Sequence, residues 1–154
     1  MFGPDDAFLT TILTLLNRLP FFPMFGNGQM RLQPVYVEDV AQAIAKILQR
    51  EQTGPDMFEC GGPRIYSYEE LLRTVASAAG IKVVLFPVPF AAWGALALIS
   101  EMLPSPPITR NQVELMQIDS TPGPGIPGLE ELGVSPHSVE EIIRDILRSP
   151  ADRA

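Results

Sequence analysis

The sequence is poor in the residues that most enzymes and metalloproteins use for their chemistry. It has one cysteine, Cys60, and one histidine, His137. An intramolecular disulfide is therefore excluded, and no cysteine and histidine cluster has metal-ligand spacing. We expect a reducing, cytoplasmic compartment. Cys60 ends a strand-like run, which indicates a buried structural thiol and not a reactive one.

Positive charge is also scarce. Eleven Lys and Arg residues against 18 Asp and Glu residues give a formal net charge of −7. An acidic chain repels phosphate backbones, so we expect no nucleic-acid partner. Asp5 and Asp6 stand where a signal peptide would be basic, so we expect no secretory signal. The longest uncharged apolar run, residues 83–100, is broken by Pro87 and Pro89 and is too short to span a bilayer.

Two motifs of nicotinamide enzymes are missing from these 154 residues. No Gly-x-Gly-x-x-Gly turn opens a helix after a strand. Gly61 and Gly62 follow a strand-like run, but Pro63 and three more residues separate them from the next helix, which argues against phosphate binding. The two lysines, Lys46 and Lys82, do not stand four residues after a tyrosine, so the Tyr/Lys pair of short-chain dehydrogenases is absent.

Other catalytic arrangements are equally weak. No Gly-x-Ser-x-Gly elbow is present, which argues against a serine hydrolase. His137 lies between Pro136 and Ser138 at a predicted helix start. This position favours a surface or capping histidine, with a catalytic base as the alternative.

The residues that are present predict an α/β protein. Hydrophobic residues make up 46% of the chain, enough for one compact domain with a sizeable core. Strand-like runs alternate with helical periodicity, while the last third is helical. Strands are expected at residues 34–37, 57–60 and 82–88, and an apolar loop at 21–25 that forms a pocket wall, an interface or core. A free-standing doubly wound sheet needs more strands than these.

Helix starts are well marked. Asp5 or Asp6, and Asp39, are plausible N-caps. Capping boxes begin at Ser67, Thr109 and Ser138. Residues 90–103 form a helix that is apolar nearly all round; burial in a core is favoured, and a face for lipid, quinone or a partner protein is the alternative.

Several short motifs carry a family resemblance by their order and spacing. They are Phe2-Gly3-Pro4 and the segments 34–41, 58–63, 68–71, 104–113 and 132–136. Together they resemble the C-terminal half of an extended or atypical short-chain dehydrogenase/reductase, in the NAD-dependent epimerase/dehydratase family. The likeness is strongest to the branch that includes the NAD(P)-binding accessory subunit of respiratory complex I.

The resemblance implies a partial Rossmann-like fold. Residues 1–148 would form a single substrate-side domain, and residues 149–154 a frayed tail. Gly3 and Pro4 would lie near the nicotinamide end of the cofactor. The residues bordering the substrate pocket would be Met24, Phe25, Arg31 and Gln33. Sugar-nucleotide enzymes often carry Arg-Asp where this chain has Leu32-Gln33, which argues against a sugar-nucleotide substrate.

Two functions follow from the resemblance, and whether the chain is an enzyme stays open between them. The first is the substrate-binding portion of a NAD(P)-dependent epimerase/dehydratase-like protein. It would be inactive and without bound NAD or NADP on its own, because the family's cofactor motifs would precede Met1. The second is a non-enzymatic assembly module that docks a protein partner or a membrane surface, as complex I accessory subunits do. We also expect either a homo-oligomer or pairing with a missing N-terminal half, because a half-fold leaves sheet edges open.

Overall fold

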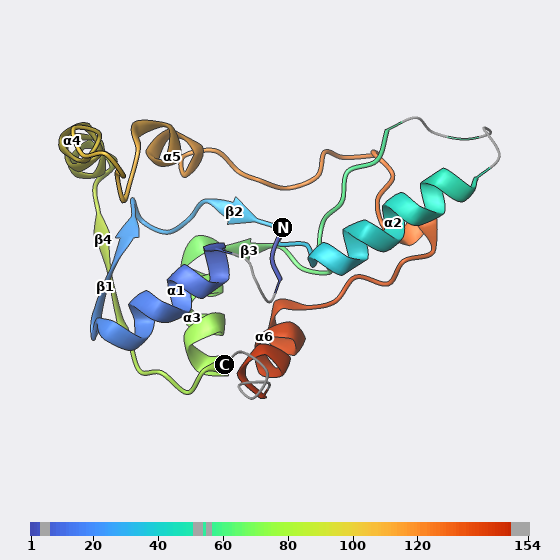
Figure 1. Ribbon diagram of the computed structural model, residues 1–154, viewed down its shortest axis with the longest axis horizontal. Coiled ribbons are helices and arrows are strands. Elements are labelled where there is room, and N and C mark those ends of the chain that lie inside the picture. The colour runs from blue at the N-terminus through green and yellow to red at the C-terminus, as the bar shows by residue number, and fades with distance from the viewer. Residues whose placement is uncertain (4–6, 51–53, 55–56, 149–154) are drawn as a thin grey trace.

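A computed structural model describes residues 1–3, 7–50, 54 and 57–148 (Figure 1). Within these residues it is an α/β fold of short strands and mostly short helices, so the predicted class is confirmed. The elements are α1 Ala7–Arg18, β1 Phe21–Phe25, β2 Arg31–Leu32, α2 Val37–Gln49, β3 Tyr66–Ser67, α3 Tyr68–Ala78, β4 Val84–Val88, α4 Phe90–Ser100, α5 Arg110–Leu115, the 3-10 turn η1 Glu130–Leu132 and α6 Val139–Arg148. Asp5, Asp6 and the predicted tail 149–154 lie outside the described residues.

The strands form two small pairs. β1 runs parallel to β4, with Phe21 opposite Val84 and Phe25 opposite Val88. β2 runs antiparallel to β3. The prediction of an apolar loop at residues 21–25 was therefore wrong. Those residues become a strand because their hydrogen-bonding partner is β4, some 60 residues further along the chain.

Two predicted strands are not formed. Tyr36 makes only an isolated parallel bridge with Phe2, whose amide donates to the Val35 carbonyl at 2.9 Å. Residues 57–60 are irregular, although the Glu59 amide donates to the Pro127 carbonyl at 3.0 Å. A short apolar run becomes a strand only where a partner strand lies beside it, and neither run has a long enough neighbour among the described residues.

The three predicted capping boxes at helix starts are confirmed. In α3 the Glu70 amide donates to the Ser67 hydroxyl and the Ser67 amide to the Glu70 carboxylate, which confirms this capping box. The boxes at Thr109 and Ser138 are confirmed in the same way. The N-cap prediction for Asp39 was wrong: α2 begins at Val37, and Asp39 lies inside its first turn.

The apolar side chains form two separate clusters. The larger one joins α1, α3 and α6, which gather around the centre and lower part of Figure 1, and contains Leu71, Leu72 and Ile143 with no more than trace exposure. The smaller one packs α2 against η1 through Val35, Ala43, Leu129, Leu132 and Val134. Within the described residues no helix is long and apolar enough to cross a membrane.

Helix α4 is mostly exposed, although the sequence favoured its burial in a core. Of its residues only Ala97 and Ser100 are buried, whereas Leu96, Leu98 and Ile99 are 49%, 57% and 65% exposed. Burial of this helix in a core was therefore wrong. It lies beside α5 at one end of the molecule, away from the three-helix core (Figure 1).

Candidate functional site

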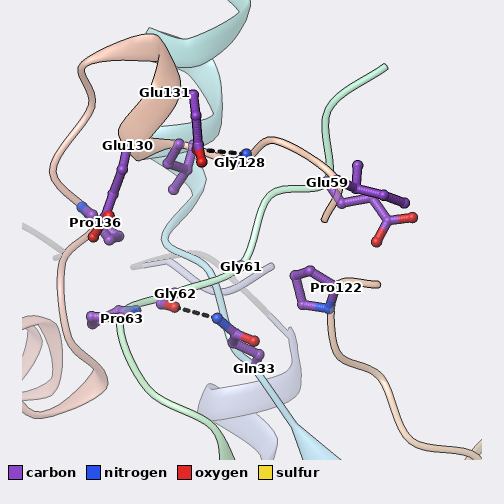
Figure 2. A pocket seen from close by; sticks show the side chains of 12 residues that line it. Gln33, Glu59, Gly61, Gly62, Pro63, Pro122, Gly128, Glu130, Glu131 and Pro136 are labelled. Carbon is purple, nitrogen blue, oxygen red and sulfur yellow. Dashed lines mark hydrogen bonds between the residues drawn. The ribbon is translucent and has the colours of Figure 1, made fainter. Parts of the chain in front are cut away.

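A cavity of about 290 Å³ opens where the segment after β2 meets the loop before β3. Figure 2 shows its wall, with Gln33 on one side and the turn that carries Glu130 and Glu131 on the other. Gln33 is the one predicted substrate-side residue in this wall. The complete lining is Gln33, Glu59, Gly61, Gly62, Pro63, Pro122, Ile126, Gly128, Leu129, Glu130, Glu131 and Pro136.

A glycine fixes the shape of the cavity. The Gln33 side-chain amide donates to the Gly62 carbonyl at 2.7 Å. Gly62 packs so closely on the Pro34 carbonyl oxygen that a Cβ there would overlap it. Since that oxygen belongs to the backbone, it cannot rotate away as a side chain could. The loop is thus held against the segment after β2 by one hydrogen bond and one close backbone contact.

The lining is acidic. Glu59 accepts from the Gly123 amide at 2.6 Å, and Glu131 accepts from the Gly128 amide at 2.8 Å. The Gly128 amide holds the pKa of Glu131 below its usual range. The lining contains three glutamates and no Lys or Arg, so its charge disfavours an anionic group. The described residues also hold no group of three or more potential metal ligands.

Met24 and Phe25 lie elsewhere, at the carboxyl end of β1. The Trp93 indole N–H donates to the Met24 carbonyl at 3.1 Å, and the Phe25 ring lies 4.4 Å from the Trp93 ring and 6.0 Å from the Tyr68 ring. Ligands of parallel α/β folds bind outside the carboxyl ends of strands. This aromatic group therefore occupies a position that suits a ligand-facing wall.

Arg31 and Gly3 have structural partners. Arg31 donates from its amide and its Nε to the two carboxylate oxygens of Asp119, each at 2.8 Å, and lowers the pKa of that carboxyl. A Cβ on Gly3 would approach Val37 Cγ1 to 2.7 Å. Pro4 lies outside the described residues. The predicted site residues are thus spread over separate parts of the fold, and their roles stay predictions.

The structure also contains a pair that the sequence did not reveal. Asp39 is fully buried and accepts from the His137 amide at 2.7 Å and from the His137 ring Nδ1 at 2.6 Å. This hydrogen bond to Asp39 raises the pKa of His137. Both carboxylate oxygens are engaged, so the pair joins the chain before α6 to the first turn of α2. No sequence signal indicated this pair, because the sequence predicted Asp39 as the N-cap, whereas it is the third residue of α2.

The chain is similar in sequence to mitochondrial NADH dehydrogenase subunits. No family model matches the chain. It is 28% identical over 150 residues to NADH dehydrogenase [ubiquinone] 1 alpha subcomplex subunit 9, mitochondrial, of Rattus norvegicus, covering 96% of this chain and 40% of the relative. It is 26% identical to the subunit of the same name from Arabidopsis thaliana, covering 91% and 37%. The chain therefore spans about 40% of the length of these relatives.

Solved structures share the fold. The Citrobacter triphenylmethane reductase complexed with NADP(H) superposes with a TM-score of 0.69 at 16% identity, covering 92% of this chain and 50% of the reductase. A UDP-glucose 4-epimerase from Thermotoga maritima gives 0.56 at 19% identity, covering 96% and 43%. The partial Rossmann-like architecture, and the resemblance to epimerase/reductase proteins and to the complex I accessory-subunit branch, are confirmed.

Proposed function

We propose that this chain is the substrate-side portion of a NAD(P)-dependent epimerase/dehydratase-like protein and does not turn over substrate by itself. The single observation behind this proposal is a contrast. The chain aligns with about 40% of the length of its relatives and with 50% of the length of an NADP(H)-complexed reductase. Its 154 residues nevertheless contain neither the glycine-rich turn nor the Tyr/Lys pair. We extend the proposal to a cytoplasmic location, peripheral to a membrane.

The described residues that line the cavity do not suit the pyrophosphate of a dinucleotide. A pyrophosphate needs backbone amides and positive potential at a helix start. The Gly61–Gly62 loop instead borders a cavity with Glu59, Glu130 and Glu131 and no basic side chain. What the chain offers a ligand is the aromatic wall of Phe25 and Trp93 and the amide of Gln33.

Isothermal titration calorimetry with NADH and with NADPH tests the proposal. We expect a dissociation constant no tighter than about 1 mM for either cofactor, corresponding to about −4 kcal/mol. A complete reductase of the same fold serves as the positive control under the same buffer. Micromolar binding by the 154-residue chain, or oxidation of NADH by it, would show that the proposal is wrong.

A second candidate function is a non-enzymatic docking module. The exposed apolar side chains of α4 favour it, and the relatives are named as subunits of an assembly. The test combines flotation with neutral and anionic vesicles and a pull-down with purified components of such an assembly. Retention that is lost in Leu98→Glu and kept in Leu48→Glu supports docking. No retention in either assay contradicts it.

A further inference from the structure

One flank of this acidic protein carries no charge. Residues 19–30 and 83–100, which contain β1, β4 and α4, include no Asp, Glu, Lys or Arg, although the whole chain has a net charge of −7. The structure brings these two segments together, because β1 and β4 pair along their whole length. We call this region, β1 with β4 and α4, the uncharged flank.

The exposed apolar side chains of the flank lie on one connected surface. In the parallel register Phe21 lies opposite Val84 and Pro23 opposite Phe86, so these side chains share one face of the pair. Phe21, Val84 and Phe86 are 60%, 57% and 40% exposed. Phe25 belongs to the same face by alternation and contacts Trp93, so α4 continues this face.

The opposite face of the strand pair is mostly covered, although Pro87 on this face is exposed. Phe22 and Met24 are buried in the main core, and Leu85 packs against it. A parallel strand pair is normally covered on both faces. Within the described residues the outer face is covered near its carboxyl end, where Phe25 contacts Trp93 and Tyr68, whereas Phe21, Val84 and Phe86 stay exposed. The remaining outer face and the exposed side of α4 therefore lack a partner among the residues that the structure describes.

We propose that the uncharged flank binds the same flank of a second copy of this chain, in a symmetric dimer. Two copies with net charge −7 repel one another wherever their acidic surfaces meet. A two-fold interface places identical surfaces together, so a surface without charge is the one on which two copies meet with least repulsion. This inference rests on the docking function proposed above, and it identifies the docking partner as a second copy of the chain.

A lipid surface fits the flank less well. Helices that lie in a membrane interface carry Lys or Arg on their polar side. Helix α4 has no basic residue, and the negative net charge opposes approach to anionic lipids. The neighbouring charged groups Glu101 and Arg110 are paired with each other at 2.8 Å.

Sedimentation velocity over a range of concentrations tests the dimer, using the 154-residue chain. We expect a concentration-dependent monomer–dimer equilibrium. It should tighten as sodium chloride rises from about 0.05 M to about 0.5 M, because salt screens the repulsion between the two acidic copies. Leu98→Glu should weaken the dimer at least about tenfold, because it buries a charge in the interface.

Leu48→Glu is the matched control. Leu48 is 80% exposed on α2, far from α4 in Figure 1, so this variant should dimerise like the unaltered chain. Circular dichroism shows whether both variants are folded. A monomer at all concentrations overturns the dimer. Equal weakening by both variants overturns the uncharged flank as its interface. A monomer that floats with phosphatidylcholine vesicles, and loses flotation in Leu98→Glu, overturns the dimer while leaving the docking function standing.

Discussion

At the scale of single residues, the Asp39–His137 pair is the most consequential contact. The two residues are 98 positions apart in the sequence, and His137 Nδ1 lies 2.6 Å from Asp39 Oδ1. Neither has a local partner pattern that would predict the contact. The sequence predicted a capping or surface role for His137, and its half-exposed ring fits that description only in part. Contacts of this kind follow from the packing of α2 against the chain before α6, which no local motif records.

The pair predicts a stability that falls with rising pH. The folded pKa of His137 is raised above 6.5, chiefly by its hydrogen bond to Asp39. Below pH 6.5 both folded and unfolded states hold the proton, and the stabilisation is fully present. It is lost as pH rises through the higher folded pKa. Because solvent screens the charge of the half-exposed ring, we expect the loss to be no more than about 1 kcal/mol.

Urea denaturation of the unaltered chain and of His137→Gln, at pH values on both sides of this window, measures the effect. The variant should show no such slope, since glutamine does not titrate. The lowered pKa values of Asp119, Glu131 and Glu141 affect stability only under acidic conditions, so they do not interfere. Parallel stability curves for the two proteins would contradict the prediction.

The contact of Gly62 with Pro34 gives a second prediction at this scale. Gly62→Ala places a Cβ against a backbone oxygen that cannot move alone. We expect a loss of at least about 2 kcal/mol in the free energy of unfolding. Gly94→Ala is the matched control, because nothing lies within 4 Å of a Cβ built there and the position is helical. It should stabilise by up to about 1 kcal/mol. Equal effects of the two substitutions in thermal denaturation would contradict this account.

At the scale of elements, helix starts could be predicted and strands mostly could not. A capping box is complete within four residues, so Ser67 and Glu70 specify the start of α3 without help from the rest of the chain. A strand needs a partner. β1 contains Pro23 between Phe22 and Met24, and a proline in an apolar run is typical of a loop. Only the pairing of β1 with β4 makes it a strand. The cavity could not be predicted for the same reason, because the hydrogen bond between Gln33 and Gly62 joins residues 29 positions apart.

The capping box of α3 should contribute measurably to stability. Ser67→Ala removes the acceptor of the Glu70 amide, so we expect a loss of about 1 kcal/mol in the free energy of unfolding. The cost should appear in global unfolding, because Leu71 and Leu72 of this helix are fully buried. Ser77→Ala, at an exposed position of the same helix, is the control and should change stability by less than about 0.5 kcal/mol. Chemical denaturation compares them, and equal losses would refute the role of the cap.

At the scale of the whole molecule, the two apolar clusters predict unequal local stability. The larger cluster joins α1, α3 and α6, whereas α2 packs mainly on η1 and leaves Ile44 and Leu48 exposed. A helix with few buried apolar contacts opens more readily than one in the main core. We therefore expect the amides of α2 to exchange with deuterium at least about tenfold faster than those of α3 under native conditions.

One substitution in each cluster separates local from global opening. Leu129→Ala removes a buried side chain from the smaller cluster, so exchange in α2 should accelerate while protection in α3 changes little. Leu72→Ala removes a fully buried side chain from the larger cluster and should accelerate exchange in both helices, because it destabilises the whole fold by about 2–5 kcal/mol. Hydrogen exchange with mass spectrometry measures both. If Leu129→Ala accelerated α3 as much as α2, the two clusters would unfold as one unit, and the division of the molecule would be wrong.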